Sequence, residues 1–435
     1  MIKLKDIHTR SLYEREKEIQ STNDSPFVFE ATNEKDKIEL QGFLVENSED
    51  VLEKIHKHGA VLLRGFKIFS ETEFEQAITS MKEFKAMDNY FMSEDGRTLV
   101  DGCNYVYHTN KKYKTGGTLS LGGFHTENYY TCDVPHFISF CCLKPSIFGG
   151  ETGLVHMGKV YNDLNPDIKE KLKVNTLFTG SHTVSEISKR YNIPEKQIKA
   201  ACNKFGLKVN TLDGGEESIA IYKPSVIYHP INNTPSLIVN LSAGIWGLDQ
   251  ALLNEFKDSY SGFKWTYHRI AWRYFPKLVL VSQVTVKQFF VVIAQLLKKK
   301  ISKKNQVQNG TKTKPDNVRT NRLGSVFAAE DTKLLAKSMR NHFTSFKWQK
   351  GDVLLIDNLQ MAHSGMPGFG SRTIRAVLSN PVSMNYSQSS PGNQCLLDTS
   401  NYKSLAAMIE SIQRSEEFDH SPTLPQTSPL VARVA

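Results

Sequence analysis

The chain has 435 residues, of which 40% are hydrophobic and 23% charged, and it carries a formal net charge of +9. These values are typical of a globular protein with a large core, and they exclude a disordered or fibrous chain. The excess positive charge lies in local blocks, above all residues 298–322, and not in the interleaved basic and aromatic pattern of a nucleic-acid-binding module. No nucleic-acid partner is therefore expected.

The six cysteines contain no CxxC pair, and the adjacent Cys141 and Cys142 would face opposite sides of a strand. A thiolate metal cage and a disulfide framework are both disfavoured, so reduced thiols and a cytoplasmic location are expected. Residues 1–20 have no apolar core of signal-peptide length, and export by that route is not expected.

The predicted elements begin after residues 1–40, which are charged, weakly periodic and expected to form an N-terminal extension. A helix is expected to end at Gly59, a buried strand to follow at 60–66, and a second helix to begin at Ser70, an N-cap residue. From about residue 119 to residue 155, short apolar runs separated by prolines and glycines indicate strands.

The second half of the chain alternates between helical and extended patterns. Two apolar runs on either side of residues 231–235 predict a hairpin. Further helices are expected at 161–172, 185–205 and 329–343, and strands at 344–358 and 372–382.

Residues 41–385 are expected to form one domain with an insertion at 252–322, followed by a flexible tail at 386–435 that is rich in Ser, Pro, Gln and Asn. Many short strands with helices kept to one side indicate an α+β chain around a β-sandwich or jelly-roll core.

The insertion contains a long apolar stretch, residues 278–297. A spanning helix would have to bury Lys287 and several polar side chains in hydrocarbon, which disfavours a membrane span. The second half of the stretch reads as an amphipathic helix followed by three lysines. Packing of this helix on the domain is the favoured interpretation. Contact with a membrane surface or a partner protein through residues 287–300 is the alternative, and it would make the protein membrane-associated.

The chemistry-bearing motif begins with "HTE", in which His125 and Glu127 are two residues apart. In a strand, such residues point to the same face. An imidazole and a carboxylate aimed into one cavity are two of the three ligands in the two-histidine, one-carboxylate triad that binds iron. A pair of this kind is also common by chance, so a second histidine is needed.

His363 is the candidate for that second histidine. It follows the apolar strand "VLLID" and precedes a Gly/Pro loop and a strand that opens with Arg372 and Arg375. The alternatives are a capped loop histidine and two arginines on a solvated strand edge.

Four blocks, in this order, resemble the taurine dioxygenase-like (TauD/TfdA) family of iron(II)- and 2-oxoglutarate-dependent dioxygenases. They are most similar to its syringomycin-biosynthesis-type hydroxylase branch. The blocks are "HGAVLLRGF", "FHTEN" continuing to "GGET", "IYHPINNTPSLIVN", and "FKWQKGDVLLIDNLQMAHSGMPGFGSR". The third departs from the family pattern, with Ile-Val where Trp-Phe is usual.

The resemblance implies a double-stranded β-helix (jelly-roll) core of the clavaminate synthase-like type, flanked by helices. It also implies Fe(II) held by His125, Glu127 and His363, with 2-oxoglutarate and O2 as cosubstrates. Halogenating relatives replace the carboxylate with a small residue, so Glu127 favours hydroxylation or another oxygen-dependent oxidation.

The family anchors the distal carboxylate of 2-oxoglutarate with an arginine on the strand after the second histidine, because a guanidinium offers bidentate geometry. Arg372 is the first choice by its place in "GSR". Arg375 is the second choice, and because it lies three residues further on it would face the other side of the strand. The resemblance also implies that Thr152, in "GGET", donates a hydroxyl to the same carboxylate.

The expected substrate is an amino acid, a carrier-protein-bound aminoacyl group or a related small metabolite, hydroxylated with release of succinate and CO2. Two alternatives are a metal-binding β-helix protein without turnover, and a peripheral membrane or partner-docking protein that acts through the insertion. Four residues are candidates for the substrate pocket: Tyr129, Tyr130, Asn104 and Asn240.

Overall fold

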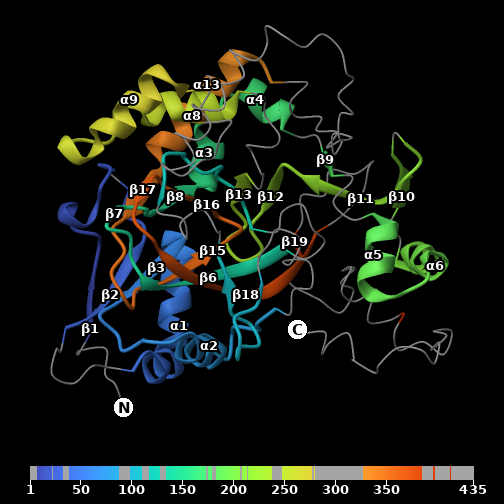
Figure 1. Cartoon of the computed structure of the whole chain (residues 1–435), viewed down its shortest axis with the longest axis horizontal. Helices are drawn as coiled ribbons and strands as arrows, with labels where there is room; N and C mark the ends of the chain where they lie inside the picture. Colours follow the sequence, from blue (N-terminus) through green and yellow to red (C-terminus); the bar gives the residue numbers. More distant parts are fainter. Residues whose placement is uncertain are drawn as a thin grey trace, which may run out of the picture.

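Two β-sheets and the helices on their outer faces form the core of this chain in a computed structural model (Figure 1). The structure describes residues 7–21, 23–32, 39–87, 98–109, 117–127, 134–172, 175–178, 183–205, 208–212, 214–237, 247–276, 279, 327–384, 395–396 and 412.

The larger sheet has the strand order β1-β2-β3-β15-β6-β18-β19, and β4 also pairs with β18. Among the described pairs of this sheet only β2 and β3 are parallel, and helix α1 supplies the crossover that a parallel pair requires. The strands are β1 (Ile7–Arg10), β2 (Phe27–Ala31), β3 (Ala60–Arg64), β4 (Tyr107–His108), β6 (Val134–Lys144), β15 (Val353–Asp357), β18 (Thr373–Met384) and β19 (Cys395–Leu396).

The smaller sheet has the order β14-β8-β16. A separate, short three-stranded sheet has the order β5-β17-β7, and its central strand β17 follows β16 in the chain. A hairpin, β12 with β13, and a distal group, β10-β11-β9, complete the described strands. Their bounds are β5 (Gly117–Thr118), β7 (Phe148–Gly149), β8 (Thr152–His156), β9 (Asn175–Phe178), β10 (Lys208–Thr211), β11 (Glu217–Pro224), β12 (Val226–Tyr228), β13 (Pro235–Leu237), β14 (Phe343–Phe346), β16 (Met361–Gly365) and β17 (Gly368–Phe369).

The alternation of side chains along β15 shows how the layers stack. Val353 and Leu355 pack against α1 and α2, whereas Leu354 and Ile356 join Leu154 of the smaller sheet in a second apolar cluster. Both faces of the larger sheet are therefore buried, one by helices and one by the smaller sheet. The outer side of the smaller sheet is covered in turn by α3, α8 and α13.

Figure 1 shows α1 and α2 below the strands and α8, α9 and α13 above them, with α5 and α6 to the right beside β10 and β11. The bounds are α1 (Leu40–His58), α2 (Glu71–Thr79), α3 (Met157–Asp163), α4 (Pro166–Lys171), α5 (Val184–Tyr191), α6 (Glu195–Phe205), α8 (Leu248–Phe256), α9 (Thr266–Tyr274) and α13 (Ala329–Asn341), with single 3-10 turns at Glu14–Glu16 and Phe263–Trp265.

Several predictions made from the sequence are confirmed. Helix α1 ends at Gly59, whose φ of 77° suits a glycine, and Ser70 caps α2 by accepting a hydrogen bond from the Glu73 N–H. Cys141 and Cys142 lie in different apolar clusters, on opposite faces of β6. The chain is a mixed α+β protein, and none of its described helices is long and apolar enough to cross a bilayer.

The N-terminal residues and the start of the expected insertion both belong to the folded core. The N-terminal residues contribute β1 and β2 to the larger sheet, and the described start of the expected insertion packs into the core through Trp265 and Trp272. Apart from Val279, the apolar stretch 278–297 and the basic helix predicted at 287–300 lie outside the described residues.

Arg64, at the end of β3, ties the N-terminal segment to the sheet. Its guanidinium is buried and donates to Glu16 and, at 3.0 and 2.6 Å, to both carboxylate oxygens of Asp352. Arg10 donates to the two oxygens of Glu16 at 2.7 and 2.8 Å. Burial by itself would raise the pKa of Glu16, but these hydrogen bonds and charges lower it to about 2.

We expect Arg64→Leu to lose about 3–5 kcal/mol of unfolding free energy, because Asp352 would remain buried without its cation, while Glu16 would keep Arg10. Chemical denaturation measures this loss. The stability that Glu16 contributes should be present above its unfolded pKa and decline as pH falls towards about 2. Lys82→Ala is the control, since its ion pairs with Glu49 and Glu83 lie on the surface. Equal losses in the two variants would contradict this account.

Candidate functional site

The site is built on a single backbone bridge between two residues far apart in the chain. The N–H of His363 donates to the His125 carbonyl at 3.0 Å, and the N–H of His125 donates to the His363 carbonyl at 3.2 Å. Because the two residues face each other across an antiparallel bridge, their side chains emerge on the same side. His363 lies within β16 and not in a loop.

Gly122 allows this close approach. A Cβ at this position would lie 2.5 Å from Ser364 Oγ and 2.9 Å from the Gly365 carbonyl oxygen, so any larger residue would push the segment away from β16. Residues 119–124 were expected to be extended, but they are irregular and pair with β16 only through Gly122 and His125. The glycines therefore serve close packing and not strand formation.

Three side chains meet at this bridge: His125, Glu127 and His363. Glu127 Oε2 lies 3.8 Å from His125 Nε2 and 3.3 Å from His363 Nε2, and the two imidazole centroids are 4.5 Å apart. The carboxylate and His363 are buried, while 28% of the His125 side chain is exposed. The structure thus brings together the three residues that the sequence singled out.

The orientation of His125 is set by a hydrogen bond behind it. Its Nδ1 lies 2.9 Å from the Gly123 carbonyl oxygen, which can only accept, so Nδ1 carries the proton. Nε2, the nitrogen nearer to Glu127, then presents a lone pair. This is the tautomer that binds a metal through Nε2.

Asn358 holds the backbone of Glu127, a role that the sequence analysis did not identify. Its Oδ1 accepts from the Glu127 N–H at 2.8 Å, and its Nδ2 donates to the Glu127 carbonyl at 3.3 Å and to the Pro135 carbonyl at 2.8 Å. The side chain is buried, so its amide satisfies backbone groups that water cannot reach. The only signal in the sequence is an amide directly after the buried strand "VLLID".

A cavity of about 180 Å³ opens beside the two histidines. Arg372 and Thr152, the two residues expected to bind 2-oxoglutarate, both line it. Arg372 donates to the Gly150 carbonyl and, at 3.4 Å, to that of Glu151, which fixes the guanidinium at the cavity wall. The remaining lining residues are Thr109, Thr118, Ser120, Gly122, Gly123, Phe140, Ser364, Gly365 and Ile374.

Glu151, which directly precedes the lining residue Thr152, does not neutralise the charge of Arg372. Glu151 is completely buried, and burial raises its pKa to about 8. A protonated Glu151 adds no negative charge near the guanidinium, which can therefore attract an anionic ligand at this wall.

Other predicted residues lie elsewhere. Arg375 faces α2, where its Nε and Nη2 lie 3.0 and 2.8 Å from Glu71 Oε1, and it does not line the cavity. Asn104 is exposed in a turn whose backbone N–H groups donate to Glu75. Tyr129, Tyr130 and Asn240 lie outside the described residues.

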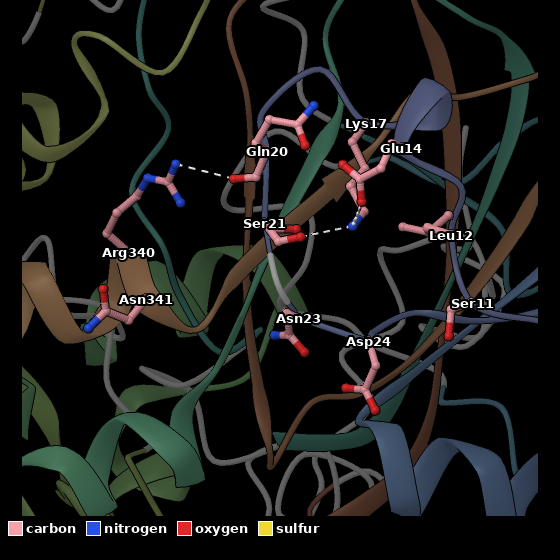
Figure 2. A pocket seen from close by; sticks show the side chains of 10 residues that line it. All are labelled: Ser11, Leu12, Glu14, Lys17, Gln20, Ser21, Asn23, Asp24, Arg340 and Asn341. Carbon is pink, nitrogen blue, oxygen red and sulfur yellow. Dashed lines mark hydrogen bonds and ion pairs between the residues drawn. The ribbon is translucent and has the colours of Figure 1, made fainter.

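A larger hollow, of about 880 Å³, lies between the N-terminal segment and the end of α13 (Figure 2). Its charged groups are engaged with their neighbours: Lys17 lies 2.8 Å from Glu14, and Arg340 donates to the Gln20 carbonyl at 3.3 Å. None of the predicted site residues that the structure describes lines it. The smaller cavity is therefore the candidate for chemistry.

Comparison with known proteins gives a family. The model of the taurine catabolism dioxygenase TauD, TfdA family matches residues 21–270, more than half of the chain. This span includes His125 and Glu127 and ends before His363.

One relative and two solved structures show how distant the similarities are. The dapdiamide synthesis protein DdaC of Enterobacter agglomerans is 20% identical over 335 residues, which cover 76% of this chain and 84% of DdaC. The PvcB protein of Pseudomonas aeruginosa is similar at 11% identity and a TM-score of 0.45, covering 87% of this chain and 93% of that one. A taurine dioxygenase from Burkholderia xenovorans has 12% identity and a TM-score of 0.42, with 87% and 91% covered.

The structural likenesses are too remote to carry an argument, so the assignment rests on the family model. The family supplies the chemistry for which a two-histidine, one-carboxylate cluster is suited. The chain therefore belongs to the TauD/TfdA family and is an oxidoreductase of the iron- and 2-oxoglutarate-dependent dioxygenase class.

Proposed function

We propose that this protein hydroxylates a C–H bond of an amino acid, a carrier-bound aminoacyl group or a related small metabolite, with Fe(II) held by His125, Glu127 and His363. One observation carries the proposal. The three candidate ligands lie together, and two of them, His125 and His363, line a cavity that the arginine and threonine expected to bind 2-oxoglutarate also line.

The three residues fit a divalent iron. Two imidazoles and one carboxylate form the facial donor set that leaves open positions on non-haem iron. Adjacent ligands of a six-coordinate ion are about 3 Å apart, and Glu127 Oε2 lies 3.3 and 3.8 Å from the two histidine nitrogens. The buried carboxylate would balance part of the charge of the metal.

The residues around the metal ligands have separate tasks. Bound Fe(II) would supply the activation of O2 that couples oxidation of 2-oxoglutarate to oxidation of the substrate. Arg372 would hold the distal carboxylate of 2-oxoglutarate through paired N–H donors, and Thr152, whose Oγ1 accepts from Trp348 at 3.3 Å, can donate its own hydroxyl to that carboxylate. Phe140 lines the cavity beside His363 and helps to exclude water.

Three further features support the finer assignment. The smaller sheet faces the larger one across a shared apolar cluster, as expected for a double-stranded β-helix of the jelly-roll type. DdaC is named for dapdiamide synthesis, in line with a biosynthetic substrate of the kind expected for the syringomycin-type branch. Glu127 retains the carboxylate and so favours hydroxylation over halogenation.

The first prediction concerns the metal. Anaerobic protein with one equivalent of Fe(II) and 2-oxoglutarate should show a weak metal-to-ligand charge-transfer band, and His363→Ala should abolish it because one of the three ligands is lost. His342→Ala is the matched control, since that ring binds Asp163 away from the cavity. A wild-type protein with no band would sink the iron assignment.

The second prediction separates the two arginines. Arg372→Ala should weaken 2-oxoglutarate binding about 10- to 100-fold, as expected when a charge-assisted bidentate contact is lost. Titration of the charge-transfer band measures this affinity. Arg375→Ala should leave the affinity unchanged, because its partner is Glu71. The reverse result would assign the anchor to Arg375.

The third prediction concerns Asn358 as a positioning residue for Glu127. Asn358→Ala should weaken Fe(II) binding about 10- to 100-fold, the usual effect of losing a group that orients a metal ligand. Asn380 offers a matched control, because its amide also bridges backbone groups, those of Glu83 and Lys85, away from the metal. If both alanine variants lose stability but bind Fe(II) equally well, Asn358 has no role beyond folding.

A further inference from the structure

A second group of metal-ligand side chains lies apart from the candidate iron residues. It consists of His56 on α1, His136 on β6, His229 after β12, and Asp357 at the end of β15. One ligand atom from each lies within 4.8 Å of the others. His136, His229 and Asp357 are buried, and His56 is partly exposed, which leaves a path to solvent.

The spacing of these groups matches a tetrahedral ion. Asp357 Oδ2 lies 2.9 Å from His229 Nε2, 3.3 Å from His56 Nδ1 and 3.6 Å from His136 Nε2. Bonds of about 2.0–2.1 Å place tetrahedral ligand atoms about 3.3 Å apart. The same geometry sets imidazole centroids about 5.2 Å apart, and the three observed separations are 5.4, 5.7 and 5.9 Å.

Hydrogen bonding to Asp357 does not account for all three imidazoles. Oδ2 already accepts from Gln360 Nε2 at 2.8 Å and lies 2.9 Å from His229 Nε2, which occupies its two lone pairs. His136 Nε2 is buried, lies 3.6 Å from this oxygen, and has no hydrogen-bond partner among the described residues. His56 Nδ1 lies 3.3 Å from the same oxygen. A buried ring nitrogen without a partner, aimed at an acceptor that already has donors, indicates that a further group binds there.

We propose that His56, His136, His229 and Asp357 bind a divalent cation of the zinc class. Three imidazoles and one carboxylate are suitable ligands for Zn²⁺, and no thiolate is needed. With four protein ligands the ion has no open position for a substrate, so the centre is structural and not catalytic. It also lies directly behind the iron site, because Asp357 precedes Asn358, which holds Glu127.

The protonation states suit a cation. Burial by itself would raise the pKa of Asp357, but the neighbouring imidazoles hold it well below its usual range, so the group is a carboxylate at neutral pH. A carboxylate is the form in which this group binds metals.

His229 must exchange a proton for the metal. The N–H groups of Ile231 and Asn232 point at its Nδ1 from 3.3 and 3.4 Å, so without a metal the ring proton is on Nε2 and is donated to Asp357. A cation that binds Nε2 displaces this proton to Nδ1 or to solvent.

The experiment uses the full chain with the iron residues removed, because zinc would also occupy the iron site. Chelator-treated His125→Ala/His363→Ala protein is loaded with Zn²⁺, desalted and analysed for metal per chain. We expect one equivalent. Loaded with Co²⁺, the same protein should show the intense visible absorption of a tetrahedral Co(II) ion, which tests the proposal without any change in the cluster.

Two further variants locate the ion. Adding His136→Phe should remove the metal while keeping the ring that stacks on Phe137 at 4.0 Å. Adding His156→Ala, a nearby histidine outside the cluster, should leave it bound. Less than one-tenth of an equivalent in the double variant, a weak six-coordinate Co(II) spectrum, or retention of the metal after His136→Phe would each overturn the proposal.

The result does not depend on the proposed function. If the iron assignment is wrong, the charge-transfer band is absent from the wild type or survives His363→Ala, while the second centre still loads. If the second centre is absent, the band is unaffected.

Discussion

The short turn between β15 and β16 is the constraint on which two groups of side chains depend: the candidate iron ligands and the second histidine cluster. Only residues 358–360 separate the last residue of β15, in the larger sheet, from the first of β16, in the smaller one. Asp357 closes the turn by accepting from the Leu359 N–H at 3.1 Å, and Asn358 faces Glu127. A turn this short leaves little freedom to its side chains. It therefore positions three groups together: His363, the Asp357 carboxylate, and Asn358, which binds the backbone of Glu127.

The site also requires the segment that contains Gly122 and His125, which pairs with β16. The reciprocal hydrogen bonds of His125 and His363 join that segment to β16, and Gly122 removes the side chain that would hold the two apart. Asn358 then fixes Glu127 two residues later. The candidate metal ligands His125, Glu127 and His363 are thus positioned by backbone contacts, which are more rigid than side-chain packing on a loop would be.

Local patterns in the sequence predicted the elements well but not the long-range pairings. Gly59 and Ser70 end and begin helices through interactions within a few residues, so their roles are readable from the chain. The segment between β1 and β2 is tied to the larger sheet by the ion pair of Glu16 with Arg64, which no periodicity reveals. Asn358 was missed for the same reason, because its partners are more than 200 residues away.

The site residues were predictable to the extent that their chemistry depends on residue type. His125, Glu127 and His363 were identified from motif resemblance and lie together in the structure. The face on which Arg375 lies agrees with its three-residue offset from Arg372, since a strand alternates sides. The residues expected to contact the substrate were inferred from nearness in sequence alone, and Asn104 shows how weak that guide is.

The buried carboxylates of this protein are stabilised in different ways, and the difference bears on function. Asp352 has a guanidinium beside it, a permanent cation that leaves no room or need for a metal. Glu151 stays protonated near neutral pH because burial raises its pKa. Glu127 and Asp357 lie beside imidazoles, whose ring nitrogens can bind a metal ion. Carboxylates placed among histidines and not arginines are therefore the positions where this fold has reason to bind a metal cation.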